Sequence, residues 1–378
     1  MTTRFPTRRA GAALALAIAA GLLAPFTARA GAPEATPKKV FVGYLFREPR
    51  EIDFRLYTHI CHAFLDADRE GRLEKARYVP SRELTTEAHG AGVKVLISLG
   101  GWGWDEAFAA IVAHPEAEDR YFHSVMEILD RFDYDGIDLD WEYPDTKDEV
   151  IGFERLTRRF RKALDNLGER KGRHMTLTMA ASANPGTLKW LDRDFLLETM
   201  DWINVMTYDF AGDWSDVAGH NAPLFASSRL QGRPRSIEAT MDYLIHDRDL
   251  PPDRLAVGIP LYGRGFAVAE PYASTKGAPK KRTPGGDYVR ISRLESDPNW
   301  VRKWDDETRT PWLISKKEPA VIGYDDPRSV AIKTEWARKK GFRGVFFWQI
   351  HGDRMPDGTN PLQSASHREW EKSTASSK

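Results

Sequence analysis

Residues 135–143 read DGIDLDWEY. Three acids at positions 138, 140 and 142 alternate with three apolar residues at positions 137, 139 and 141. On a β-strand successive side chains point to opposite faces, so the acids share one face, with steps of about 6.6 Å between neighbours. We predict that the apolar face packs against helices, that the acids point into a barrel, and that Glu142 lies nearest its mouth.

Seven further stretches are short and rich in β-branched and aromatic residues, which indicates strands. Together with the first stretch they lie at residues 39–45, 58–65, 94–100, 135–143, 175–182, 202–210, 255–262 and 344–350. The segments between them can hold helices; residues 149–168, for example, keep helical spacing, and Gly168 is the expected stop. Eight alternating units predict a closed (β/α)₈ TIM barrel. A doubly wound open sheet is less favoured, because no glycine-rich phosphate loop follows the first strand.

The barrel is predicted to span residues 38–363, with one unusually long connection inside it. Residues 265–319 are rich in Pro, Gly, Lys and aromatic residues. Because a structureless loop of that length is uncommon in a compact domain, we predict a small α+β insertion domain between strands seven and eight, at the C-terminal mouth where the active sites of such barrels lie. The ends at residues 31–37 and 364–378 are expected to be mobile tails.

Residues 1–30 have the features of an export signal. Arginines precede a run of small apolar residues, and Ala28-Arg29-Ala30 matches the pattern that signal peptidases cleave. The apolar run is too short to span a bilayer, so a membrane anchor is less favoured. We predict a secreted or periplasmic protein cleaved after Ala30. Thr7-Arg8-Arg9 leaves both the general and the twin-arginine route open.

Composition excludes several classes of protein. The chain has 378 residues, of which 41% are hydrophobic and 29% charged, as in globular proteins. Its 55 basic residues balance 55 acidic ones without a long basic run, so a nucleic-acid partner is not expected. Without the four arginines of residues 1–30 the net charge is −4. Cys61 is the only cysteine, which excludes an intrachain disulfide. We expect no membrane association of the mature form, and nothing indicates an obligate protein partner.

Two structural explanations of the alternating acids fit poorly. A calcium loop would need a glycine turn and a later glutamate, whereas Ile, Leu and Trp between the acids favour a strand. Simple burial of three stacked carboxylates would cost several kcal/mol unless some of them held protons. Such crowding separates pKa values, which is what acid catalysis requires.

The stretch Asp135-Gly-Ile-Asp138-Leu-Asp140-Trp-Glu142 resembles the D-x-x-D-x-D-x-E signature of family 18 glycoside hydrolases, the chitinases. The resemblance runs from about Lys39 to Asp353. It includes four further motifs at strand ends: Ser98-Leu-Gly-Gly101, Met206-Thr-Tyr208-Asp209, Tyr262-Gly-Arg264 and Trp348. Residues 265–319 resemble the insertion domain that walls one side of the cleft in one branch of the family.

The resemblance implies a retaining, substrate-assisted mechanism without a metal or organic cofactor. Glu142 would protonate the glycosidic oxygen, while the acetamido carbonyl of the sugar on the glycon side of that bond, the −1 sugar, attacks the anomeric carbon. Asp140 would orient the acetamido N–H and stabilise the oxazolinium ion that forms, and Asp138 would share a proton with Asp140. Water would then open the ring, with Glu142 as base.

The resemblance also suggests roles for neighbouring residues. Tyr44 and Ser98 stand at positions on their strands that alternate toward the barrel interior, and they would bind Asp138. Tyr208, on the same face as Met206, would donate to the acetamide carbonyl, and Trp348 would stack under the −1 sugar. Two positions are ambiguous. Strand alternation predicts that the side chain of Asp209 points away from the barrel interior, although the family places it near the acetamido group. Arg264 would either bind substrate or pair with Asp209. The remaining candidates are outer-subsite or packing residues (Trp102, Trp104, Trp214) and structural residues (Asp135, His59, His62, His351).

Three functions remain open at this level. A hydrolase of chitin or chitooligosaccharides is favoured by the intact acids and the insertion. An endo-β-N-acetylglucosaminidase or a peptidoglycan hydrolase would share the chemistry. A chitin-binding lectin of the same fold is less favoured, because such proteins usually lose the acid at the position of Glu142.

Overall fold

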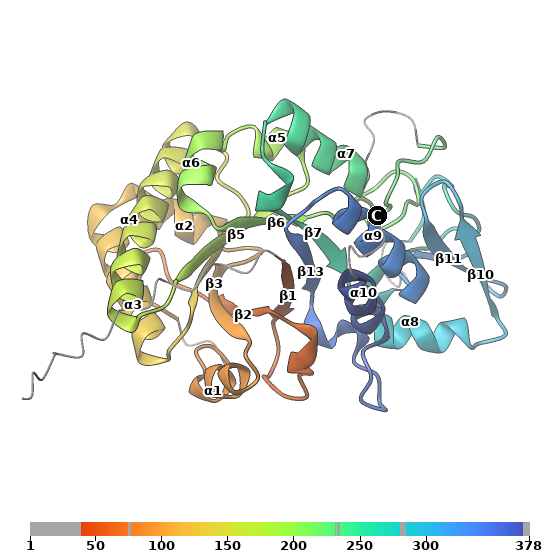
Figure 1. Ribbon diagram of the computed structural model, residues 1–378. Coiled ribbons are helices and arrows are strands. Elements are labelled where there is room, and N and C mark those ends of the chain that lie inside the picture. The colour runs from red at the N-terminus through yellow and green to blue at the C-terminus, as the bar shows by residue number, and fades with distance from the viewer. Residues whose placement is uncertain (1–38, 75–76, 231, 233–234, 280–284, 373–378) are drawn as a thin grey trace, which may run out of the picture. The chain divides into compact units, whose positions relative to one another are not determined.

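In the computed structural model the described residues are 39–372, except 75–76, 231, 233–234 and 280–284. The export signal and the tail predicted at residues 31–37 lie outside them. Eight parallel strands close into a barrel in the order β1-β13-β7-β6-β5-β4-β3-β2 (Figure 1). They are β1 (Val40–Leu45), β2 (His59–Leu65), β3 (Lys94–Gly100), β4 (Gly136–Asp140), β5 (Thr176–Ser182), β6 (Trp202–Met206), β7 (Leu255–Pro260) and β13 (Gly344–Trp348). The predicted TIM barrel is confirmed.

Side chains alternate across this barrel as the sequence pattern predicted. Even-numbered residues of β4 face the interior, whereas Ile137 and Leu139 belong to the large core between strands and helices. Trp141 continues this outer row, with its ring stacked on Phe108 at 5.2 Å. A second, smaller core fills the interior with Val40, Val42, Tyr44, Cys61, Ala63, Leu96, Trp202, Ala256 and Phe346. The interior is therefore a packed floor beneath the mouth.

Helices cover the outside of the barrel (Figure 1). They are α1 (Arg82–Gly90), α2 (Asp105–Ala113), α3 (Pro115–Arg131), α4 (Lys147–Lys171), α5 (Pro185–Leu188), α6 (Arg193–Thr199), α7 (Ile237–Asp242), α9 (Pro327–Lys339) and α10 (Pro361–Glu371), with short 3₁₀ or π turns at Phe54–Leu56, Tyr243–Asp247, Pro252–Arg254 and Ile350–Asp353. In α4 the expected stop at Gly168 is wrong. The helix continues to Lys171 and is capped by Gly172, whose φ of 67° is left-handed, a conformation that commonly ends a helix.

The long connection forms a five-stranded antiparallel sheet with one helix. Its strands run in the order β10-β11-β12-β8-β9. The elements are β8 (Tyr262–Phe266), β9 (Gly286–Asp287), α8 (Tyr288–Glu295), β10 (Trp300–Asp305), β11 (Thr310–Ser315) and β12 (Val321–Gly323). Tyr262–Arg264 therefore does not end the seventh barrel strand, as expected, because from Tyr262 onward the backbone pairs with β9 and β12.

The tail predicted from Ser364 is wrong for most of its length. Residues up to Glu371 belong to α10, whose Leu362 and Trp370 are buried and whose Ser366 Oγ lies 2.6 Å from Thr334 Oγ1 of α9. The apolar residues of α10 recur at helical spacing, so the sequence itself contained a pattern that predicts a helix here. Within the described part of the chain, no helix is long and apolar enough to cross a membrane.

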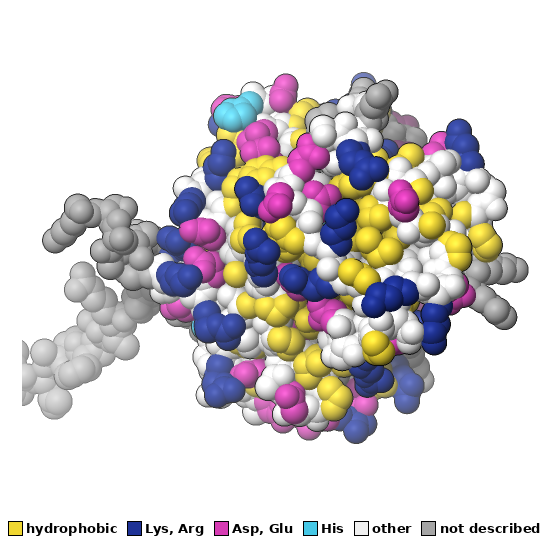
Figure 2. Space-filling view, turned by 90° about the vertical axis from the view of Figure 1, so that its right-hand side faces the viewer, with side chains coloured by type: hydrophobic (Ala, Val, Ile, Leu, Met, Phe, Trp, Pro, Cys, Tyr) yellow, Lys and Arg dark blue, Asp and Glu magenta, His cyan; other side chains and the backbone are white. Residues whose placement is uncertain are grey.

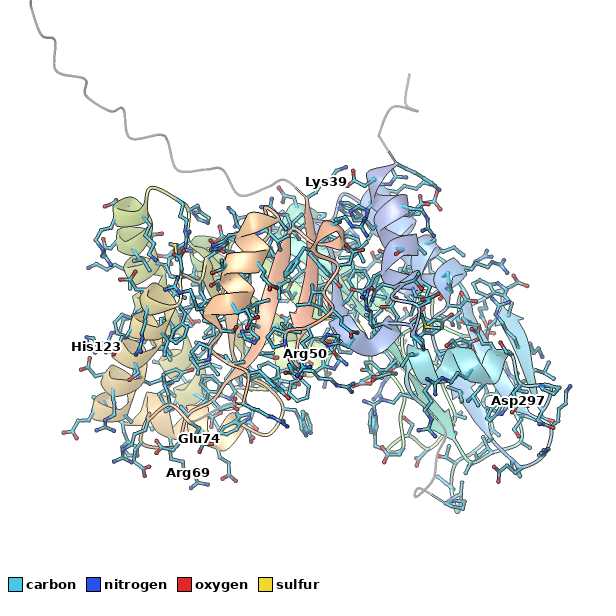
Figure 3. All side chains as sticks on the ribbon, turned by 90° about the horizontal axis from the view of Figure 1, so that it is seen from below. Lys39, Arg50, Arg69, Glu74, His123 and Asp297 are labelled. Carbon is cyan, nitrogen blue, oxygen red and sulfur yellow. The ribbon has the colours of Figure 1, made fainter. Side chains whose placement is uncertain are left out.

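Two further views place the surfaces of the molecule. In Figure 3, Lys39 at the start of β1 lies at one edge, while Arg69 and Glu74, which follow β2, lie at the opposite edge. That second edge is the C-terminal rim of the barrel. Figure 2 shows that basic and acidic side chains are interspersed on the face seen there, which includes the side of the insertion, rather than gathered into one basic surface.

Candidate active site

Asp138, in the middle of β4, is fully buried inside the barrel. Four side chains on four other strands donate hydrogen bonds to its carboxylate. Tyr44 Oη and Ser98 Oγ lie 2.9 and 2.8 Å from Oδ2, and Thr178 Oγ1 and Asn204 Nδ2 lie 2.6 and 3.2 Å from Oδ1. Burial raises the pKa of Asp138, while the four bonds oppose that rise. Tyr44 and Ser98 lie where they were expected.

Thr178 and Asn204 were not predicted as site residues. Both stand on the interior face of their strands by the alternation that places Asp138 on the interior face of β4. Strand alternation therefore predicts that both side chains point inward, but a threonine or an asparagine inside a strand does not by its residue type indicate a contact with Asp138.

Asp140 ends β4 one step closer to the mouth and is 2% exposed. Its Oδ1 is buried and has no hydrogen-bond partner among the described residues. Burial, then the charges of Glu142 and Asp138, raise the pKa of Asp140 well above its usual range. An acid in this position favours its protonated form and leaves an oxygen available to a bound molecule.

Glu142 lies two residues beyond the end of β4, since the strand is shorter than the predicted 135–143. Tyr143 Oη donates a 2.8 Å hydrogen bond to Glu142 Oε2. Burial raises the pKa of Glu142, as does the charge of Asp209, whereas the bond from Tyr143 lowers it. Sequence reasoning missed Tyr143, because a residue beside an acid on a strand should point to the other face.

Asp209 also lies in the site, contrary to the parity expectation. β6 ends at Met206, and the chain turns through Asp209, whose φ of 57° is left-handed. Its Oδ1 accepts hydrogen bonds from Tyr262 Oη at 2.7 Å and from Arg264 Nε at 2.8 Å. The structure thus pairs Arg264 with Asp209 and draws both into the cleft.

The mouth opens into a cleft of about 1250 Å³. It brings together predicted site residues from the ends of four barrel strands, β3, β4, β6 and β13, and from the insertion: Trp102, Asp140, Glu142, Met206, Tyr208, Asp209, Arg264 and Trp348. Residues that were not predicted also line it, namely Phe46, Arg47, Phe64, Asp66, Arg77, Tyr78, Val79, Tyr143, Gly286, Asp287 and Gln349. Asp138, Tyr44 and Ser98 support the site from beneath and are not part of its surface.

Aromatic side chains form much of the cleft. Trp348 lies on its floor, stacked at 5.8 Å on Phe64 and 5.7 Å from the ring of Phe46. Trp102 is 81% and Trp214 50% exposed, which is unusual for tryptophan. The guanidinium of Arg264 lies 5.1 Å from the Trp214 ring. Exposed rings beside carboxylates provide the stacking surface and the hydrogen-bonding groups that sugars require.

Tyr208 stands beside the acids with its ring 6.2 Å from that of Tyr262. Burial, then the charges of Tyr262 and Asp140, raise the pKa of Tyr208 well above its usual range. The hydroxyl therefore keeps its proton and can donate a hydrogen bond into the cleft.

Other acids and histidines lie away from the cleft. Asp135, at the opposite end of β4, accepts hydrogen bonds from His89 Nε2 at 2.7 Å and Val95 N at 2.8 Å. His62 Nδ1 lies 2.8 Å from Tyr134 Oη inside the fold. His59 Nδ1 and His351 Nε2 contact Thr58 Oγ1 and the Arg50 carbonyl, both at 2.9 Å. Among the residues that the structure describes, no three His, Cys, Asp or Glu side chains converge as a metal site.

Comparison with known families gives one match across most of the chain. Residues 39–353 match the family model of the glycosyl hydrolases family 18. Chitinase A1 of Niallia circulans is 30% identical over 295 residues, which are 72% of this chain and 42% of that protein. Chitinase 1 of Aphanocladium album is 26% identical over 350 residues, 85% of this chain and 81% of that one. The chain thus spans less than half the length of the first of these relatives.

Solved structures share the fold. The GH18 chitinase of Cycas revoluta, solved in complex with (GlcNAc)4, superimposes with a TM-score of 0.76 at 26% identity, over 88% of this chain and 99% of that one. The Group IV chitinase of Ostrinia furnacalis superimposes with a TM-score of 0.77 at 24% identity, over 88% and 99% of the two chains.

Proposed function

The chain belongs to the glycosyl hydrolases family 18, and from this premise we propose that it hydrolyses the β-1,4 linkages between N-acetylglucosamine units of chitin or chitooligosaccharides. Cleavage retains the anomeric configuration and uses the acetamido group of the substrate as nucleophile. The observation that carries the proposal is the row of Asp138, Asp140 and Glu142, which leads from the buried interior to the floor of an aromatic cleft.

Glu142 is the general acid and base. Its carboxyl group borders the cleft, and its pKa is raised by burial and by Asp209, so it holds a proton nearer to neutral pH than a free glutamate does. It protonates the leaving oxygen. Once the oxazolinium ion has formed, the same carboxylate accepts a proton from the attacking water.

Asp140 orients the nucleophile. Its buried Oδ1 without a partner among the described residues fits an acceptor for the acetamido N–H. As positive charge develops on the oxazolinium ring, Asp140 acts as a carboxylate and its proton passes to Asp138. The four donors around Asp138 fix that residue in place for the exchange.

Trp348 and Tyr208 hold the −1 sugar between them. The indole of Trp348 provides a flat apolar surface for one sugar face, and the hydroxyl of Tyr208 donates to the acetamido carbonyl. Trp102 and Trp214 offer further stacking surfaces along the cleft.

The test is product analysis on N-acetylglucosamine oligomers of defined length, beside a glycoprotein and peptidoglycan. Chitin oligomers are expected to be cut with retention, and an oxazoline mimic such as a thiazoline is expected to inhibit. Cellulose and fully deacetylated chitosan should bind without being cut, because neither carries the nucleophile. Cleavage of cellulose at a comparable rate would overturn the mechanism, and preferential cleavage of the glycoprotein or of peptidoglycan would replace the substrate.

We also propose that residues 1–30 direct export and are removed. The support is the apolar run and the Ala-x-Ala pattern before Gly31. Sequencing the N-terminus of protein recovered outside the cytoplasm tests it, with Gly31 as the expected first residue and Met1 as the contrary result.

A further inference from the structure

An ion pair joins two residues from different parts of the chain at the cleft. Arg47 Nη2 of the loop after β1 lies 3.0 Å from Asp287 Oδ2 of the insertion. Both residues line the cleft that contains the acids. The side chains are 57% and 29% exposed, so the pair lies at the cleft surface and not in a core.

Both partners are presented by anchored backbone. The loop of Arg47 is held two ways: His351 Nε2 lies 2.9 Å from the carbonyl of Arg50, and Arg354 Nε lies 3.8 Å from Glu51 Oε2. Figure 3 shows Arg50 at the side of the barrel that faces the insertion.

Asp287 is held by the insertion sheet. It is the register partner of Tyr262 in the β8–β9 pair, and the next amide, Tyr288 N, donates a 2.8 Å bond to the carbonyl of Leu261. An ion pair between two anchored segments keeps its position better than one between free side chains.

Barrel topology places this pair relative to the acids. β13 lies between β1 and β7 in the barrel, and four steps around the ring in either direction separate β13 from β4. The pair links the connection after β1 with the insertion after β7, so it spans the sector above β13. Trp348 ends β13 and Glu142 follows β4. The pair therefore stands beyond Trp348 on the side away from Glu142.

Substrate direction follows from the proposed function, on which this inference rests. The anomeric carbon of the −1 sugar must face Glu142, so the sugars toward the non-reducing end extend from Trp348 away from Glu142. They run toward the pair. The Phe46 ring lies 5.7 Å from that of Trp348, and Arg47 is the next residue, with its Cα about 3.8 Å further along the chain. Little space remains between the floor tryptophan and the pair.

We propose that Arg47 and Asp287 form the end wall of the cleft and limit the substrate to two sugars on the non-reducing side of the cleaved bond. The exposed guanidinium N–H groups and the free carboxylate oxygen face the terminal sugar, whose ring hydroxyls can accept from Arg47 and donate to Asp287. The enzyme then removes disaccharides from non-reducing ends. Exposed ion pairs contribute little to folding stability. The pair therefore affects substrate binding, through its position and its polar groups, and not the stability of the fold.

The experiment follows the first products of chitohexaose labelled at its reducing end. The unmodified protein is expected to give labelled tetramer as the main initial product. In Arg47→Ala and in Asp287→Ala the ratio of labelled trimer to labelled tetramer should rise at least threefold, because a third sugar can pass the end of the cleft. The charge swap that combines Arg47→Asp with Asp287→Arg should return the ratio toward that of the unmodified protein.

The matched control is Arg69→Ala, which breaks the exposed ion pair between Arg69 and Glu106 outside the cleft and should leave the ratio unchanged. An unchanged ratio in both cleft variants, at normal turnover, overturns the wall and leaves the proposed function standing. If the ratio of labelled trimer to labelled tetramer in the charge-swap variant stays as high as in the single variants, the two residues do not act as an ion pair. If the unmodified protein does not cut the hexamer at all, the proposed function fails and the wall with it.

Discussion

Glu142 has two neighbours that move its pKa in opposite directions, and each can be removed by a substitution of similar shape. Asp209 raises the pKa through its charge, and Tyr143 lowers it through a hydrogen bond to the carboxylate. Because the protonated form is the active acid, the rate falls as the pH rises through this pKa. The alkaline limb of kcat/KM should therefore shift to lower pH in Asp209→Asn and to higher pH in Tyr143→Phe.

The measurement is the pH profile of kcat/KM for the unmodified protein and both variants on one short substrate. The position of the limb is compared and not the height of the profile, because Asp209 also binds Arg264 and its loss can lower the rate. Shifts of equal sign in the two variants would contradict the assignment of the limb to Glu142.

A second prediction concerns Glu142 itself. Glu142→Gln keeps the shape of the side chain and removes the transferable proton, so turnover should fall by at least about 10²-fold. Calorimetric affinity for a chitooligosaccharide should stay within about tenfold, because the cleft lining is otherwise intact. Turnover above a tenth of the normal rate would remove Glu142 from the acid role.

Alternation along one strand was enough to predict which acids face the interior. It failed for Asp209 and for Tyr143, because both lie beyond a strand end, where the two-residue period no longer holds. The partners of Asp138 from β5 and β6 obeyed the alternation, yet nothing in their residue types marked them. Contacts between strands distant in sequence are visible only once the barrel is closed.

The role of the insertion in substrate binding can be tested by a deletion that keeps the pairing of β8 with β12. Phe266 of β8 and Val321 of β12 are register partners, so a short Gly/Ser turn can replace residues 267–320 and leave the β8–β12 pair. Activity on hexamers and polymer should fall far more than activity on a fluorogenic disaccharide, because the disaccharide meets the insertion only at Asp287, whereas a longer chain runs further along the cleft beside it.

Thermal unfolding followed by circular dichroism provides the control for the deletion. Phe266 and Trp312 of the insertion pack with Ala211 and Ala218 of the β6–α7 connection, so some loss of stability is expected. A cooperative transition would show that the barrel survives. Equal losses on short and long substrates in such a folded variant would contradict a role of the insertion in binding distant sugars.

Regular elements were predictable where a period continued, and their ends were not. All eight barrel strands appear where the apolar runs predicted them. Gly168 was chosen as a helix stop because it is the first glycine after the periodic stretch. In the helix a side chain at this position would meet the carbonyl oxygen of Arg173 at 2.7 Å, so packing explains this glycine and Gly172 provides the stop. The choice between two nearby glycines depends on contacts that a sequence does not display.

The whole molecule should lose stability in acid through its buried histidines. Burial lowers the pKa of His62 to about 3, from an ordinary value near 6.5. Between these two values the unfolded chain binds a proton that the folded one does not, so the free energy of unfolding falls as the pH falls. Each such proton contributes a slope of about 1.4 kcal/mol per pH unit.

Denaturant titrations from pH 6.5 to pH 4 measure that slope. In His62→Gln it should be shallower by up to about 1.4 kcal/mol per pH unit. The exposed His123, replaced in the same way, is the control for the substitution itself. Identical slopes in all three proteins would show that His62 does not take up the proton on unfolding.

Cys61 has a practical consequence for testing whether this protein moves along a chitin fibre between cleavage events. The chain contains no other cysteine, and this one is fully buried in the barrel interior, where burial raises the pKa of its thiol well above the ordinary range. Thiol-reactive dyes attack thiolates, so they should pass Cys61 by. A cysteine introduced on the exposed side of α4, as in Glu169→Cys, would then carry a single fluorophore without any prior removal of native cysteines. Individual molecules could be followed on an insoluble fibre, and the length of each run between landing and release could be read directly.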